Sequence, residues 1–325
     1  MVVRLRKLIA RSRKNERGMA LLATLLAVAL MTILVVDFAT SAALGYRSAA
    51  NQADELRALY LARSGVQVGI AILERDSIND ALQKTAYDGL DEIWAIPVPP
   101  IQIDGGTISV SIIDEARKVN VNRLYDVQSR QINDKYAQMI ARLFEATGIS
   151  TDLIPIIADW LDPDSIDSPG GAESDYYLQL MPPYEPRNSS MPTIGDLRAL
   201  KGMDDVTFYR LAGLLTTTRE PGINLNTASP EVLAALSPGL SNNPDLVKEI
   251  INARGNHPFT ATTDAMNLPG ISEAMPPDPA LQLTVTSRHF TIIGQGQFAG
   301  ARRRIYAVVR RNSNGSSMLI SWHED

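Results

Sequence analysis

The sequence predicts an α+β protein with a long N-terminal helix, a small antiparallel sheet and a large α-helical domain inserted between the strands. Three observations favour this fold. The chain of 325 residues begins with a basic segment followed by an uncharged apolar run over residues 19–36. A half-buried strand pattern near residue 107 is matched by comparable patterns only after residue 288. The long stretch between them has helical periodicity.

Charge is distributed unevenly along the chain. Residues 1–18 carry seven basic side chains and one acidic side chain, and the whole chain has a net charge of −5, so residues 19–325 carry about −11. Such an acidic head is not attracted to nucleic acid by its overall field. The chain contains no cysteine, which excludes disulfides, thiolate metal sites and cysteine nucleophiles.

The apolar run over residues 19–36 is long enough to span a bilayer, and the basic residues ahead of it place the N-terminus in the cytoplasm. A simple signal anchor is one interpretation. A conventional secretory signal is another, although this apolar run exceeds the usual core of roughly 7–15 residues. The third interpretation uses the pair Arg17-Gly18: cleavage after Gly18 would remove the basic leader and keep the apolar helix on the mature chain.

The third arrangement resembles the leader of type IV prepilins. The resemblance implies that a membrane aspartyl prepilin peptidase cuts between Gly18 and Met19 and that the new N-terminus, Met19, is methylated. Most pilins carry glutamate at mature position five, where it is thought to neutralise the terminal amine of a neighbouring subunit; here that position is Ala23. An unpaired carboxylate in apolar surroundings costs several kcal/mol, so Ala23 favours a subunit that has nothing above it in a filament.

The N-terminal helix is expected to run from Met19 to about Leu73, which corresponds to roughly 80 Å. Steps of three and four residues predict one packed face in its second half. The residues predicted on this face are Leu56, Leu59, Arg63, Val66, Ile70 and Leu73. Gly65 and Gly69 are expected to allow a close approach to a sheet.

Alternating apolar and polar residues predict strands over residues 107–113, 289–293, 305–311 and 318–322. The stretch between the first two strands predicts helices over residues 129–147, 151–161, 193–200, 205–215, 230–236 and 244–253. The predicted organisation is a leader over 1–18, the membrane and polymerisation helix over 19–75, and an α/β domain over 76–122 and 286–325. The helical insert occupies residues 123–285.

Residues 193–203 and 263–271 each resemble the first helix and glycine turn of a helix-hairpin-helix module, which many proteins use on DNA. The head is acidic, and neither turn has a cluster of lysine or arginine. We therefore expect these turns to serve packing or protein contact rather than DNA binding.

An acidic loop is the main candidate for a functional site. Six carboxylates fall within residues 159–175, interrupted by prolines and glycines, and the pattern departs from an EF-hand at its fifth and sixth positions. A solvated acidic loop is one interpretation. The other is a cation site, and oxygen ligands alone favour calcium over magnesium or manganese. The predicted ligands are Asp162, Asp164, Glu173 and Asp175, with Asp159 and Asp167 as further candidates.

Catalysis has little support in the sequence. His257, His289 and His323 are far apart, and the chain has no Gly-x-Ser-x-Gly, P-loop or His-Glu-x-x-His motif. We therefore expect the protein not to be an enzyme.

Several short motifs in a specific order resemble the protein K family, the large minor pseudopilins of type II secretion systems. They are RGMALL at 17–22, DEARKVNVN at 114–122, DWLD at 159–162, GAESDYY at 171–177 and NLNTAS at 224–229. The resemblance implies a pilin-like fold with a helical insert and calcium in the head. It also implies a single-pass inner-membrane protein whose head lies in the periplasm.

The same resemblance implies a place at the pseudopilus tip with the minor pseudopilins I and J, in contact with other pseudopilins and with exported substrates. There the protein would start assembly and limit filament length during export across the outer membrane. Two other functions stay open: a minor pilin of a type IV pilus, and a signal-anchored periplasmic calcium-binding protein.

Overall fold

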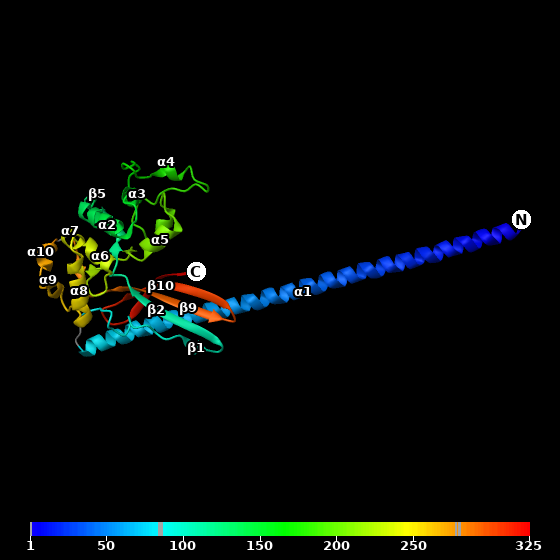
Figure 1. The fold of residues 1–325 in the computed structure, drawn as a ribbon, viewed down its shortest axis with the longest axis horizontal. Helices are drawn as coiled ribbons and strands as arrows, with labels where there is room; N and C mark the ends of the chain where they lie inside the picture. Colours follow the sequence, from blue (N-terminus) through cyan, green and yellow to red (C-terminus); the bar gives the residue numbers. More distant parts are fainter. Residues whose placement is uncertain (1, 84–86, 277, 279–280) are drawn as a thin grey trace.

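A single helix, α1 (Val2–Gln83), runs through the whole N-terminal quarter of the chain and carries the head at its C-terminal end (Figure 1). The computed structural model describes residues 2–83, 87–276, 278 and 281–325. The helix extends past the predicted end near Leu73. Within the described residues, one helix is long and apolar enough to cross a membrane, and the most apolar window of that helix has no buried residue.

Five antiparallel strands form the main sheet, in the order β1-β2-β9-β10-β11. Their bounds are β1 (Ile101–Ile103), β2 (Gly106–Asp114), β9 (His289–Phe298), β10 (Ala301–Arg311) and β11 (Ser317–Glu324). The four predicted strands are present, and β1 is an addition. The chain leaves this sheet at Asp114 and returns at His289, and these two ends lie side by side because Asp114 pairs with Phe290.

Strand β9 continues five residues beyond its predicted end. The prediction stopped at residue 293 because Gly294 and Gly296 follow, and glycine is not typical of a strand pattern. Both glycines face α1. A Cβ at Gly294 would lie 2.3 Å from the carbonyl oxygen of Ala62, and a Cβ at Gly296 would lie 2.0 Å from that of Ala58. A Cβ at Gly69 would lie 2.4 Å from Ile292, so the expected close approach of the helix to the sheet is confirmed.

The packed face of α1 differs from the predicted face. Its centre is formed by small residues, Ala58 and Ala62, which are fully buried because the backbone of β9 lies directly against them. Larger side chains are displaced from this contact. Of the residues predicted on this face, Val66 and Leu73 are buried, and Leu59 and Ile70 are partly buried. Leu56 and Arg63 are exposed. The placement of Leu56 and Arg63 in the packed face was therefore wrong.

The insert is predominantly helical and lies above the sheet and to its left in the view of Figure 1, whereas α1 runs along the sheet and contacts β2, β9 and β10. Its α-helices are α2 (Asp134–Thr147), α3 (Leu153–Leu161), α4 (Ser174–Tyr177), α5 (Asp205–Ala212), α6 (Pro230–Ala235), α7 (Pro238–Ser241), α8 (Pro244–Asn256), α9 (Thr262–Met266) and α10 (Ile271–Ala274). Two 3-10 helices, η1 (Val121–Leu124) and η2 (Ile194–Ala199), belong to the same region.

Three pairs of short strands tie the insert together. They are β3 (Val119–Asn120) with β6 (Leu215–Thr216), β4 (Tyr125–Asp126) with β5 (Gln131–Ile132), and β7 (Ile223–Asn224) with β8 (Leu283–Thr284). Strand β5 explains why α2 starts five residues after its predicted start. Asn133 then caps the helix, accepting a hydrogen bond from the Tyr136 amide. Gly148, directly after the predicted end at residue 147, ends the helix in the left-handed conformation.

The hydrophobic side chains form two separate cores. One lies inside the insert and includes Phe144 and Tyr177, and the other lies between α1 and the sheet and includes Ile108 and Phe290. The head therefore has an α/β unit attached to α1 and a helical unit, each with its own buried apolar residues.

Candidate metal centre

Three buried carboxylates converge where α3 ends and α4 begins. Asp159 belongs to α3, Asp162 is the residue that ends that helix, and Glu173 precedes α4. One oxygen from each of these side chains lies within 4.8 Å of the other two. Because α3 is otherwise apolar and faces the core of the insert, its C-terminal carboxylates are held at a buried position instead of extending into water.

The backbone of residues 168–173 closes around Asp159. This carboxylate accepts hydrogen bonds from the Ser168 amide, at 3.1 Å to Oδ2, and from the Ala172 amide, at 2.9 Å. A Cβ at Gly171 would lie only 1.9 Å from Asp159 Oδ2. Only glycine fits there, so Gly171 allows the loop to wrap tightly over the carboxylate.

Other oxygens of this group are buried without hydrogen-bond partners among the described residues: Asp162 Oδ1, both carboxylate oxygens of Glu173, and Asn188 Oδ1. Burying an unpaired polar group is costly, and for a charged group the cost is larger. Several oxygens that converge and lack donors fit a hard cation such as calcium, which takes six to eight oxygen ligands. The residues present therefore fit a calcium ion.

The electrostatics of the group agree with this fit. Burial raises the pKa of Glu173 to about 7, and the nearby carboxylates of Asp159 and Asp162 add to the increase. Burial also raises the pKa of Asp162 to about 6, with Asp164 and Asp159 contributing. Both shifts follow from burial and from negative charge crowded at this position, and a bound cation would relieve both.

The predicted ligands are only partly brought together. Asp162, Glu173 and the further candidate Asp159 form the buried group, whereas Asp164, Asp167 and Asp175 are exposed and lie outside it. Asp164 Oδ1 accepts a hydrogen bond from the Ile166 amide at 2.9 Å.

Asn188 lies beside the site and was missed in the sequence analysis; its side chain is close enough to Glu173 to lower the pKa of that carboxylate. Its side-chain nitrogen donates to the carbonyl oxygen of Asp164, which leaves its buried Oδ1 free to act as a ligand. The residue follows a proline-rich segment, and nothing in its local pattern distinguishes it from other loop asparagines.

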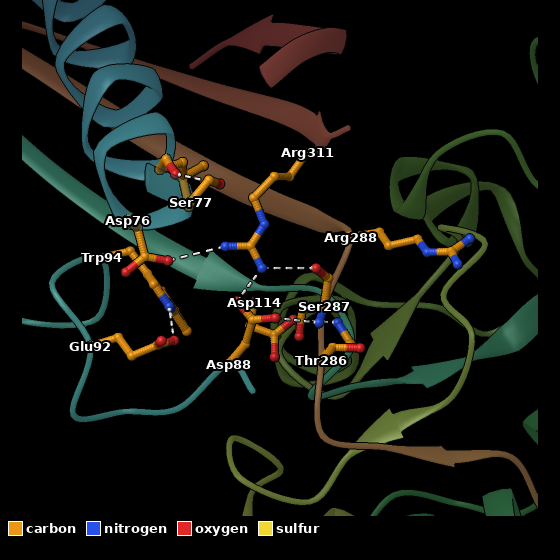
Figure 2. A network of polar contacts seen from close by, with 12 residues as sticks. Asp76, Ser77, Asp88, Glu92, Trp94, Asp114, Thr286, Ser287, Arg288 and Arg311 are labelled. Atoms are coloured by element: carbon orange, nitrogen blue, oxygen red, sulfur yellow. Dashed lines mark hydrogen bonds and ion pairs between the residues drawn. The ribbon is translucent and has the colours of Figure 1, made fainter. Parts of the chain in front are cut away.

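A second carboxylate group, also missed in the sequence, surrounds Arg311 at the end of β10 (Figure 2). The guanidinium donates to Asp76 of α1 at 3.0 Å and also contacts Asp88. Glu92 accepts hydrogen bonds from the Trp94 indole at 2.9 Å and from the Gly89 amide at 3.0 Å. Because an arginine already neutralises this group, its geometry is that of a structural ion-pair cluster.

The three histidines occupy separate structural positions. His289 Nδ1 lies 2.7 Å from Glu220 Oε1, at the start of β9. His323 stacks on Tyr306 with ring centroids 4.9 Å apart, and His257 ends helix α8. None of these surroundings pairs a histidine with a nucleophile among the described contacts.

The architecture defines a class. A single apolar N-terminal helix whose second half packs on an antiparallel sheet is a pilin-like subunit, here enlarged by a helical insert that carries a candidate cation site. Two family models, both described as type II secretion system (T2SS) protein K, match residues 117–220 and 223–286, together more than half of the chain. The chain belongs to the protein K family of type II secretion systems.

Relatives and a solved structure agree with this assignment. The type II secretion system protein K of Pseudomonas aeruginosa is 29% identical over 318 residues, covering 95% of this chain and 93% of the relative. The protein K of Klebsiella pneumoniae is 29% identical over 236 residues, covering 69% and 71%. The crystal structure of the GspK-GspI-GspJ complex from enterotoxigenic Escherichia coli contains a chain with a TM-score of 0.70 and 17% identity. That match covers 86% of this chain and 99% of the solved chain, and the fold is shared.

The family is a structural pseudopilin component of a protein-transport system. The exposed apolar helix fits a single membrane-spanning anchor.

Proposed function

We propose that this protein is a non-enzymatic minor pseudopilin at the tip of the type II secretion pseudopilus, where it starts assembly and limits filament length during export across the outer membrane. The observation that carries this proposal is the N-terminal helix. Its apolar side chains over residues 19–36 are largely exposed, for example Leu22 at 72%. Such a surface needs cover from a bilayer or from other helices.

Position Ala23 supports the tip location. A carboxylate at this place would pair with the terminal amine of an adjacent subunit, and alanine cannot make that contact. The broad head beside α1 would also obstruct a further subunit above it. Both features favour the end of a filament over its interior.

The partners we propose are the minor pseudopilins I and J, with further contacts to other pseudopilins and to exported substrates. The support is the similar fold of the chain in the GspK-GspI-GspJ complex. We place the anchor in the inner membrane and the head in the periplasm. Prepilin peptidase would cut between Gly18 and Met19, and methylation of Met19 would follow; mass spectrometry of the mature N-terminus tests both steps.

We also propose that calcium binds between Asp159, Asp162 and Glu173, with Asn188 supplying a neutral oxygen. The ion would neutralise the crowded carboxylates and connect α3 to α4. Comparing the melting temperature of the protein in calcium with that in chelator tests the site. We expect the melting temperature to be clearly higher in calcium than in chelator, and equal melting temperatures in the two conditions would contradict the assignment.

The tip proposal is tested with Ala23→Glu. We expect the head to remain folded while incorporation, pseudopilus length and secretion change, because the new carboxylate could recruit a subunit above. Thr24→Glu is the matched control, since it places the same charge one position away, where it faces a different side of the helix. Unchanged filament length and unchanged secretion in Ala23→Glu would count against a tip role.

A further inference from the structure

The glycine turn that follows η2 belongs to one of the two helix-hairpin-helix-like segments. Gly202 adopts the left-handed conformation, with φ of 75°, between η2 and α5. Lys201 immediately before it is directed into the protein instead of toward solvent, since its side chain is half-buried and makes contacts within the head. The turn therefore has an internal role.

Lys201 contacts the chain on both sides of Glu173. Its ammonium group donates to the carbonyl oxygen of Gly171 at 3.1 Å and lies 5.0 Å from the ring centre of Tyr176. Its backbone amide donates to the hydroxyl of Tyr177 at 3.3 Å, and Tyr177 is fully buried. One residue thus holds the segment that leads into α4 and the helix itself.

Gly171 connects these contacts to the carboxylates. Its backbone lies directly over Asp159, where a Cβ would be 1.9 Å from Oδ2, and Glu173 follows two residues later. Fixing the Gly171 carbonyl from outside therefore limits where the loop lies on Asp159 and where Glu173 points. We propose that Lys201 is a positioning residue for the cation site, and that the helix-hairpin-helix-like turn holds the loop over residues 168–173 closed around it.

This inference rests on the proposed binding of calcium. Charge repulsion between Lys201 and the cation would have the opposite effect on calcium affinity. A lysine that merely lies near a cation site repels the cation, so its removal would strengthen binding. A lysine that positions the ligands would weaken binding when removed, because supporting hydrogen bonds around metal ligands are worth about 10–100-fold in affinity. The direction of the change therefore separates the two roles.

The experiment measures calcium affinity by titration calorimetry on the full-length protein in detergent. We expect Lys201→Met to weaken calcium binding by about tenfold, and Lys201→Arg, which keeps a donor and a charge, to restore most of that loss. The melting temperature in chelator should change little in both variants. Lys248→Met, which removes an exposed lysine paired with Asp245 on α8, is the control and should bind calcium like the parent.

Unchanged or stronger binding in Lys201→Met would overturn the inference. If that variant does not fold, Lys201→Gln decides, because it removes the ammonium group that donates to the Gly171 carbonyl and keeps a polar side chain; weaker calcium binding supports the inference and parental binding overturns it. A parent protein that binds no calcium would instead overturn the proposed site itself.

Discussion

Glu173 has the least compensated position among the carboxylates of the candidate metal centre. Both of its oxygens are buried, and neither makes a hydrogen bond of regular geometry in the part of the chain that the structure describes, although the nearby Asn188 side chain lowers its pKa. Its raised pKa, about 7, follows from this burial and from the neighbouring Asp159 and Asp162. Either a proton or a cation can relieve the unfavourable charge. The behaviour of this residue therefore reports on the occupancy of the site.

We expect Glu173→Gln to abolish the rise in melting temperature that calcium produces. The amide keeps the shape of the side chain but removes a charged ligand oxygen, so stability in chelator should be equal to the parent's or higher. Differential scanning calorimetry with calcium and with chelator measures both effects. Asp167→Asn is the control because Asp167 is exposed and outside the buried group; a full calcium response in Glu173→Gln would argue against its role as a ligand.

The stabilisation by calcium should increase with pH. The folded calcium-free head holds protons on Glu173 and Asp162 up to about pH 7 and about pH 6, whereas the unfolded chain releases them near the ordinary carboxylate values. Without calcium, these two groups therefore lower the stability as the pH rises through this interval. Calcium replaces the protons, so the difference in melting temperature should grow between about pH 5 and about pH 8.

Melting curves at fixed free calcium and in chelator, recorded across that interval, check the pH prediction. The double variant Asp162→Asn/Glu173→Gln should remove the dependence. A calcium effect that is constant with pH, or that decreases as the pH rises, would contradict the titration of these two carboxylates.

At the scale of elements, the contact between α1 and β9 determines how the head is held on its helix. Gly294 and Gly296 leave no side chains between the strand and the helix, so Ala58 and Ala62 pack against backbone. Local patterns favoured larger apolar residues at this contact. The glycines of β9 could be recognised as contact residues only after the helix and the strand had been placed together.

We expect Gly294→Ala to destabilise the protein by about 1–3 kcal/mol, because the added Cβ would lie 2.3 Å from the Ala62 carbonyl and the helix would have to move. Urea unfolding followed by circular dichroism measures this cost. Gly255→Ala in α8 is the matched control: a Cβ there meets nothing within 4 Å, so stability should be retained or slightly increased. Equal stabilities of the two variants would refute the close-packing argument.

In the acidic loop, too, the local sequence predicted where the site lies but not which side chains meet there. Its composition predicted a cation site within residues 159–175, and a group of three carboxylates lies there. Spacing alone did not separate Asp159, which the loop folds over, from Asp164 and Asp175, which are exposed. The ligand status of the group stays a prediction until calcium binding is measured.

At the scale of the whole molecule, a polar cluster connects α1, the sheet and the return from the insert. Arg311 on β10 contacts Asp76 of α1 and Asp88, and it donates to the carbonyl oxygen of Ser287 at 3.2 Å (Figure 2). The Ser287 amide donates to Asp88 at 2.7 Å. Three segments distant in sequence are therefore fixed to one guanidinium, next to the position where the insert joins the sheet.

We expect Arg311→Met to cost about 3–5 kcal/mol, since removing one partner of a buried ion pair leaves uncompensated charge. Burial raises the pKa of Asp76 to about 7 while Arg311 opposes that shift, so without the arginine this carboxylate should hold its proton to higher pH. The loss of stability should therefore be larger at about pH 8 than at about pH 6.

Denaturant unfolding at both pH values tests this prediction, with Arg302→Met as the control because Arg302 is an exposed arginine on the same strand. A loss of stability as small as that of the control, or one that decreases at higher pH, would contradict the structural role of the cluster.

Local sequence patterns were enough to predict the apolar N-terminal helix, the strands on either side of a helical insert, and the loop that holds the crowded carboxylates. These features follow from periodicity, composition and charge within short windows of the chain. Three features became visible only once the chain had folded: small residues form the packed face of α1, Asn188 lies beside the carboxylates, and Arg311 connects three segments. The physical reason is that each of these depends on which backbone or side chain lies opposite, and the partners are far apart in the chain.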